Sequence, residues 1–126
     1  MYDEVLQAVI QMAELTGVTI RTGSMPPDNG IAMTASGGSE SIMLDIGSNE
    51  RFSVLCNGKN RSQETVIRQL NQIHRELTRR KVFPITGNWQ IYAIETTSSP
   101  RLLGHEPNGQ WVYGSSLLVK FNVKGI

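Results

Sequence analysis

The clearest structural pattern of the chain lies in Arg51-Phe-Ser-Val-Leu-Cys-Asn-Gly-Lys-Asn60 and in the run that follows it, Arg61-Ser-Gln-Glu-Thr-Val-Ile-Arg-Gln-Leu-Asn-Gln-Ile-His-Arg-Glu-Leu-Thr-Arg-Arg80. Alternating apolar residues at 52, 54 and 56 predict a strand with one buried face. Asn57-Gly58 is a tight-turn dipeptide. Apolar residues then recur at helical spacing, which predicts an amphipathic helix over 62–80. The stretch therefore indicates a strand–turn–helix unit.

The same patterns predict the remaining elements on both sides of this unit. A helix is expected over 3–15, ending at Gly17, and a final strand over 111–124. Further strands are expected over 18–22, 31–35, 42–46 and 89–97, the middle ones as an antiparallel meander. Thr97-Ser-Ser-Pro100 should end the strand before it, leaving 101–109 as a connector. The order predicts an α+β fold with a mixed, mostly antiparallel sheet packed against two main helices.

Length and composition set broad limits on the class of protein. The 126 residues predict a single domain over 1–126, and 39% hydrophobic with 18% charged residues excludes a disordered tail. One cysteine excludes an internal disulfide. No apolar run approaches the roughly 18 residues of a membrane span. The acidic start, Met1-Tyr-Asp-Glu4, is unlike a signal peptide. We expect a soluble protein made in a reducing cytoplasm, with no membrane partner.

Charge is unevenly distributed along a chain whose net charge is only +1. Residues 1–50 carry seven acidic and one basic side chain, a net charge of −6. Residues 51–81 carry eight basic and two acidic ones, a net charge of +6, and 82–126 carry +1. This division favours a protein that contacts copies of itself or a charged neighbour, more than it favours a catalyst.

Candidate catalytic groups are few, and each has a structural explanation. His74 falls one residue beyond the apolar stripe and is expected on the flank of its helix. His105-Glu106 is the one plausible base–carboxylate pair for an enzyme, but no activated nucleophile accompanies it. Cys56 is expected to be a buried thiol. The spacing of Gly47 and Gly58 does not match a phosphate-binding loop. The sequence predicts no catalytic site, cofactor or metal.

The basic residues of 59–81 allow three interpretations. They form a solvated helix face, a surface complementary to an acidic neighbour, or a phosphate-binding patch. No aromatic residue is interleaved with them, which argues against a nucleic-acid-binding module that stacks bases.

Two runs of sequence resemble a known family. They are Phe52-Ser-Val-Leu-Cys-Asn-Gly-Lys59 with Gln69-Leu-Asn-Gln-Ile-His-Arg-Glu-Leu77, and Pro100-Arg-Leu-Leu-Gly-His-Glu106 with Gln110-Trp-Val-Tyr-Gly-Ser-Ser-Leu-Leu-Val-Lys-Phe121. Over roughly residues 1–125 the chain resembles minor capsid proteins of tailed phages and prophages of Gram-positive bacteria. These are similar to the tail-terminator, or head–tail joining, proteins of long-tailed phages.

The resemblance implies an assembly role without catalytic residues. Such proteins form a hexameric ring that caps the head-proximal end of the tail tube, stops polymerisation and docks to the head. The implied partners are the tail tube protein and a head-completion or connector protein, with DNA passing through the lumen without sequence-specific binding. The implied location is the virion neck, after assembly in the host cytoplasm. A head-closure or minor capsid neck protein is the nearest alternative.

A ring needs one patch to meet a different patch on the next copy. We therefore expect Arg68, Arg75 and Arg79 to contact acidic positions such as Asp45 or Glu50 of a neighbour. Two polar, turn-rich loops, 23–30 and 97–109, are expected to contact tube or head proteins. Their candidate residues are Pro26, Asp28, Arg101, His105 and Asn108.

Overall fold

The computed structural model describes residues 2–36 and 49–123. The elements are α1 (Tyr2–Ala13), η1 (Glu14–Thr16), β1 (Ile20–Thr22), β2 (Gly30–Ser36), β3 (Asn49–Asn60), α2 (Gln63–Thr78), β4 (Trp89–His105) and β5 (Trp111–Val123). They form a five-stranded sheet of order β1-β2-β3-β5-β4. Neighbouring strands are antiparallel except β1 and β2, which are parallel. The predicted α+β class and mixed sheet are confirmed, whereas the strand predicted over 42–46 lies outside the described residues.

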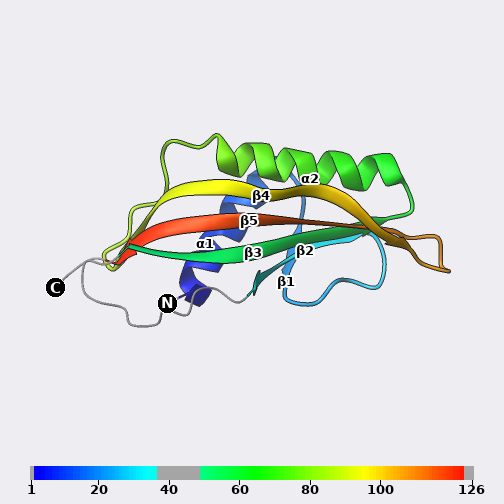
Figure 1. Cartoon of the computed structure of the whole chain (residues 1–126), viewed down its shortest axis with the longest axis horizontal. Helices are drawn as coiled ribbons and strands as arrows, with labels where there is room; N and C mark the ends of the chain where they lie inside the picture. Colours follow the sequence, from blue (N-terminus) through cyan, green and yellow to red (C-terminus); the bar gives the residue numbers. More distant parts are fainter. Residues whose placement is uncertain (1, 37–48, 124–126) are drawn as a thin grey trace.

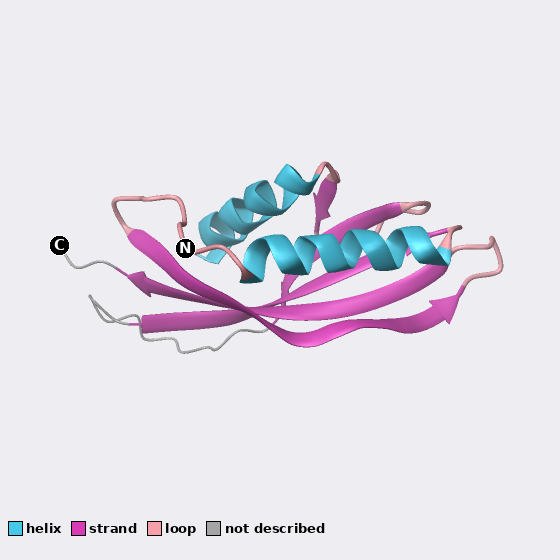
Figure 2. Cartoon of the chain, turned by 90° about the horizontal axis from the view of Figure 1, so that it is seen from above, coloured by secondary structure: helices cyan, strands magenta, loops and turns pink. Residues whose placement is uncertain are grey.

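Both helices lie on the same side of the sheet, so the described chain forms two layers (Figures 1 and 2). Helix α2 runs along the strands, and its stripe of Val66, Leu70, Ile73 and Leu77 is fully buried. The helix begins where the side chain of Ser62 accepts a hydrogen bond from the Thr65 amide, a standard N-cap. Helix α1 packs on the same core and ends through η1 at Gly17, which has a φ of +93°.

Gly58 is not a turn residue, contrary to the sequence prediction. Strand β3 runs without interruption through Asn57-Gly58 to Asn60, pairing with β2 on one side and β5 on the other. The glycine is required for packing. A Cβ at position 58 would lie 2.5 Å from Ile31 Cδ1 and 2.9 Å from Val66 Cγ2. The absent side chain lets the start of α2 approach the sheet.

Pro100 does not end the penultimate strand, which is the second correction. Strand β4 continues from Trp89 to His105, and its register against β5 shifts at four places. Proline lacks an N–H and is tolerated on edge strands and at bulges. Strand β4 is an edge strand, and one register shift lies between Ser98 and Arg101. The predicted connector over 101–109 is thus mostly strand, and its turn is confined to residues 106–110.

Candidate subunit interface

The outward side of α2 carries a ridge of polar residues. Arg68, Gln72, Arg75 and Arg79, which we call the arginine ridge, are spaced at i, i+4, i+7 and i+11. Each is two positions beyond a residue of the buried stripe, so each points about 200° away from the core. All four are exposed. The ridge is therefore the part of α2 that faces away from the sheet.

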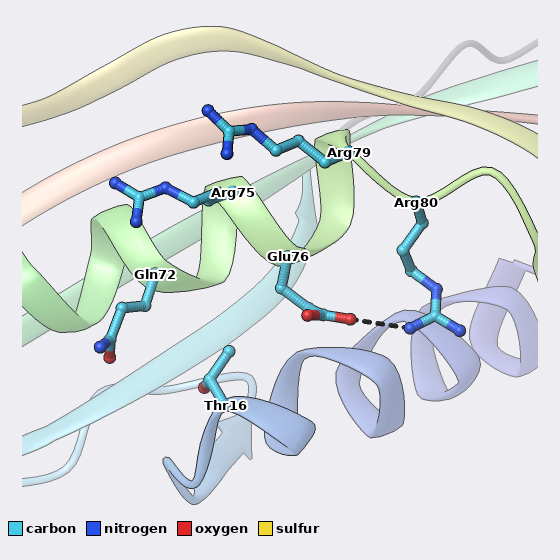
Figure 3. Close-up of a pocket in the computed structure, with 6 residues that line it drawn as sticks. All are labelled: Thr16, Gln72, Arg75, Glu76, Arg79 and Arg80. Atoms are coloured by element: carbon cyan, nitrogen blue, oxygen red, sulfur yellow. Dashed lines mark hydrogen bonds and ion pairs between the residues drawn. The ribbon is translucent and has the colours of Figure 1, made fainter.

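The three arginines of the ridge have no side-chain hydrogen bond or ion pair to any other described residue. By contrast, Arg80 pairs with Glu76 at 2.8 Å. A groove of about 490 Å³ separates α2 from η1, lined by Arg75, Arg79, Arg80, Glu76, Gln72 and Thr16. Figure 3 shows Arg75 and Arg79 extending side by side, away from the Glu76–Arg80 pair. Two free guanidinium groups one helical turn apart can hold two neighbouring carboxylates or one larger anion.

Of the two acidic residues predicted to contact the arginine ridge of a neighbour, one is buried and one is outside the described residues. Asp45 lies outside the described residues. Glu50 lies in β3, on the face that packs under the helices, and is 8% exposed. In this protomer the carboxylate of Glu50 is therefore largely inaccessible to an arginine of another copy.

The two predicted contact loops come together at one end of the molecule. The backbone N–H of Asn29 donates a hydrogen bond of 2.9 Å to Gln110 Oε1, which joins the β1–β2 loop to the β4–β5 turn. The buried ammonium of Lys59 contacts both carboxylate oxygens of Glu106 at 3.1 Å, tying the same turn to β3. Sequence alone gave no signal for this network, because its members are separated by up to 81 positions.

Each predicted loop residue has a definite position. Asp28 and Asn108 are exposed, whereas Pro26 is buried, and a Cβ at Gly30 would lie 2.5 Å from Pro26 Cγ. Arg101 and His105 are exposed residues of β4 rather than of a loop. This end of the molecule therefore presents Asp28 and Asn108 on a framework held by internal hydrogen bonds.

His105 and Glu106 do not form a base–carboxylate pair. The imidazole of His105 stacks on Trp111, with ring centroids 3.8 Å apart and planes 5° apart. The Glu106 carboxylate is engaged by Lys59. The arrangement fixes the β4–β5 turn and leaves the two groups in separate contacts.

His74 is buried, which corrects its predicted place on the helix flank. The residue is 6% exposed, and Nδ1 shares a hydrogen bond of 2.8 Å with Thr96 Oγ1. Burial lowers the pKa of His74 below its usual value, so the neutral imidazole is favoured. The histidine therefore joins α2 to β4. The flank prediction failed because α2 buries a wider face than its apolar stripe.

Cys56 is a buried thiol, as predicted. Burial raises its pKa to about 12, so it is not a reactive thiolate. Within residues 2–36 and 49–123, no three His, Cys, Asp or Glu side chains are grouped as a metal site. No helix in that part of the chain is long and apolar enough to cross a membrane.

These features describe a two-layer α+β domain that exposes charged surfaces and fixed turns. The sequence matches the family model described as bacteriophage tail terminator protein over residues 9–123, and the chain belongs to that family. The predicted resemblance is thereby confirmed, and the protein is a phage structural protein related to the tail. No curated protein matches the sequence. The fold is similar to a chain in the virion of a native gene transfer agent particle. That match has 11% identity and a TM-score of 0.62, and it covers 92% of each chain.

Proposed function

We propose that this protein is the tail terminator of its phage. In this role it forms a ring, expected to be hexameric, on the head-proximal end of the tail tube. The ring stops tube polymerisation and joins the tail to the head, while DNA passes through its lumen without being read. Membership of the tail terminator family over residues 9–123 is the observation that carries the proposal.

The arginine ridge supplies the proposed contact between copies. Arg68, Arg75 and Arg79 are exposed and unpaired within the described residues, so acidic positions of a neighbour gain charge-assisted hydrogen bonds there. Asp45 remains a proposed partner. Glu50 serves less well because it is buried.

Sedimentation of a charge-reversed variant tests this contact. Arg75→Glu with Arg79→Glu should shift a ring to monomers in analytical ultracentrifugation. Arg61→Glu with Lys81→Glu makes the same charge change at exposed positions off the ridge, and should leave the ring intact. Rings that persist in the first variant would exclude the ridge as a contact between copies.

The turn end of the molecule is the proposed contact with tube or head proteins. Asp28, Asn108, Arg101 and His105 lie at or near this end, which is held in shape by the Lys59–Glu106 ion pair. Electron microscopy of the protein with tail tubes should show rings at one tube end. Asp28→Ala with Asn108→Ala should reduce this capping without dispersing free rings.

The alternatives give different results in the same experiments. A head-closure or minor capsid neck protein would bind filled heads and leave tube ends bare. A nucleic-acid-binding module would instead bind short duplexes with an affinity that falls steeply as salt rises.

A further inference from the structure

The face of the sheet opposite the helices, which we call the open face, has a small depression lined by two leucines and by polar residues. Core residues of β3 alternate with Leu55, which is 37% exposed and points away from the helices. Leu103 of β4 lies over Gly114, where a Cβ would be only 2.7 Å from Leu103 Cδ1. Leu103 is 54% exposed. With Arg101, Ser98 and Ser116 they line a depression of about 220 Å³.

The open face is also basic. Among the described residues, alternation along the strands and the lining of the depression place four cations and one carboxylate on it, a net charge of +3, in addition to Lys59, whose charge is offset by its pairing with Glu106. These residues are Arg21, Arg51, Arg101, Lys120 and Glu95. Glu95 is paired with Lys120 at 3.1 Å, so it neutralises none of the arginines directly. The side chains of Arg21 and Arg101 have no hydrogen-bond or ion-pair partner among the described residues.

The α1–η1 segment, on the other side of the sheet, has the opposite character. Residues 2–16 contain Asp3, Glu4 and Glu14 but no lysine or arginine, a net charge of −3. Leu15, beside Glu14, is 70% exposed. The carboxylate of Glu14 accepts a hydrogen bond from the Ile20 backbone amide at 3.0 Å, whereas Asp3 and Glu4 lie at the other end of α1. An exposed leucine on an acidic segment is complementary to a basic face whose depression two leucines and an arginine help to line.

We propose that α1–η1 of one copy packs on the open face of the next copy. Leu15 enters the depression between Leu55 and Leu103, while the carboxylates of the segment face Arg21 and Arg101. The proposal rests on the ring function above. It adds a second pair of surfaces to the contact proposed for the arginine ridge, and it assigns Arg101 to the next copy instead of to a tube or head protein.

This contact has the geometry that a ring needs. The two surfaces lie on opposite faces of one sheet, so the contact is heterologous and joins copies head to tail. Such a series closes into a ring when the rotation between neighbouring copies is a whole fraction of a full turn. It also covers the exposed leucines of the open face, completing a third layer on the sheet. Arginines and hydroxyls alone would equally suit DNA phosphates. The exposed leucines favour a protein as the bound partner, because burying them against apolar side chains is favourable, whereas phosphate groups offer no apolar contact.

Cysteine cross-linking between copies tests the contact directly. Leu15→Cys protein is mixed with a size-tagged Leu103→Cys protein and oxidised with diamide at high protein concentration. A disulfide requires Cα atoms within about 7 Å, so the mixed dimer reports the proposed contact even when it is transient. Cys56 is buried and does not compete.

Leu102→Cys is the matched control for the partner position. Leu102 is adjacent and 51% exposed, but it pairs with Tyr113, whose hydroxyl accepts a hydrogen bond from Gln63 on the helix side. We expect a mixed dimer of Leu15→Cys with Leu103→Cys, and several-fold less with Leu102→Cys. Adding Arg101→Glu to the Leu103→Cys protein should reduce the yield several-fold.

Three results would overturn the proposal. The first is an equal yield of mixed dimer with Leu102→Cys and with Leu103→Cys. The second is disulfides that form only between identical variants. The third is duplex DNA that protects the cysteine of Leu103→Cys from oxidation, together with loss of DNA binding in Arg101→Glu. The last result would assign the open face to DNA. A protein that caps tail tubes without forming the mixed disulfide would keep the proposed function and lose this contact.

Discussion

Replacing Gly58 by alanine should destabilise the fold, because this position lets α2 approach the sheet. The added methyl group would start 2.5 Å from Ile31 Cδ1 and 2.9 Å from Val66 Cγ2. Both neighbours are fully buried in the core and have little room to move. Overpacking of this kind costs about 1–3 kcal/mol.

A gain in the unfolded state partly offsets this cost. Alanine restricts the unfolded chain more than glycine does, which stabilises the folded protein by about 0.4–1 kcal/mol where the backbone permits it. Gly87→Ala is the matched control, since a Cβ there has no neighbour within 4 Å and its φ is not positive. The difference between the two variants isolates the packing term, at about 1–3 kcal/mol.

Urea denaturation followed by circular dichroism measures this difference. Gly58→Ala should unfold at a lower urea concentration than Gly87→Ala, with an unchanged slope of free energy against denaturant. Thermal unfolding should shift down by roughly 4 °C per kcal/mol. Equal midpoints for the two variants would refute the close approach of α2 to β3 at this point.

Three further predictions concern stability. Ser62→Ala removes the N-cap of α2 and should cost about 1 kcal/mol in urea denaturation, whereas an unchanged midpoint would show that the cap contributes nothing. Because burial lowers the pKa of His74, the unfolded chain takes up the proton first as pH falls below about 6.5. The free energy of unfolding should thus be independent of His74 protonation above that pH and should decline below it. His74→Gln should flatten this decline; an equal decline in the variant would show that another group takes up the proton. Glu106→Gln leaves the Lys59 ammonium buried without its carboxylate and should cost about 1–3 kcal/mol, more than Lys59→Met, which removes the charge itself; the reverse order would contradict this account of the pair.

Local signals predicted α1, α2 and β5 well. The apolar spacing of α2 is a property of neighbouring residues, and the structure follows it. The alternation in β5 between buried Leu117, Val119 and Phe121 and their partly exposed neighbours is likewise a local pattern. Such elements are predictable because one face of each is fixed by the core.

The wrong predictions arose where tertiary context overrides local chemistry. Asn57-Gly58 is a turn signal, but Gly58 serves helix–sheet packing that involves Ile31 and Val66. Pro100 usually breaks a strand because it lacks an N–H. Strand β4 lies at the edge of the sheet, where one side of the strand has no neighbouring strand to accept such a hydrogen bond. Neither outcome is encoded within a few residues of the site.

The candidate interface was predictable only in part. The helical spacing indicated that Arg68, Arg75 and Arg79 share the outward face, and all three are exposed. The burial of Glu50 was not foreseen, because the predicted strand begins after it, whereas β3 begins at Asn49 and alternation then places Glu50 on the core face with Phe52. The open face required the three-dimensional sheet, since Leu55 and Leu103 come together through the bulged pairing of β4.

The length of tail tubes assembled in the presence of the protein is the decisive test of the proposed terminator function. Purified tube protein is polymerised with and without it, and electron micrographs give the distribution of tube lengths and the occupancy of the ends. With the protein present, tubes are expected to stop growing and to carry a ring at one end. Tubes that lengthen equally in both reactions, with bare ends, would contradict it.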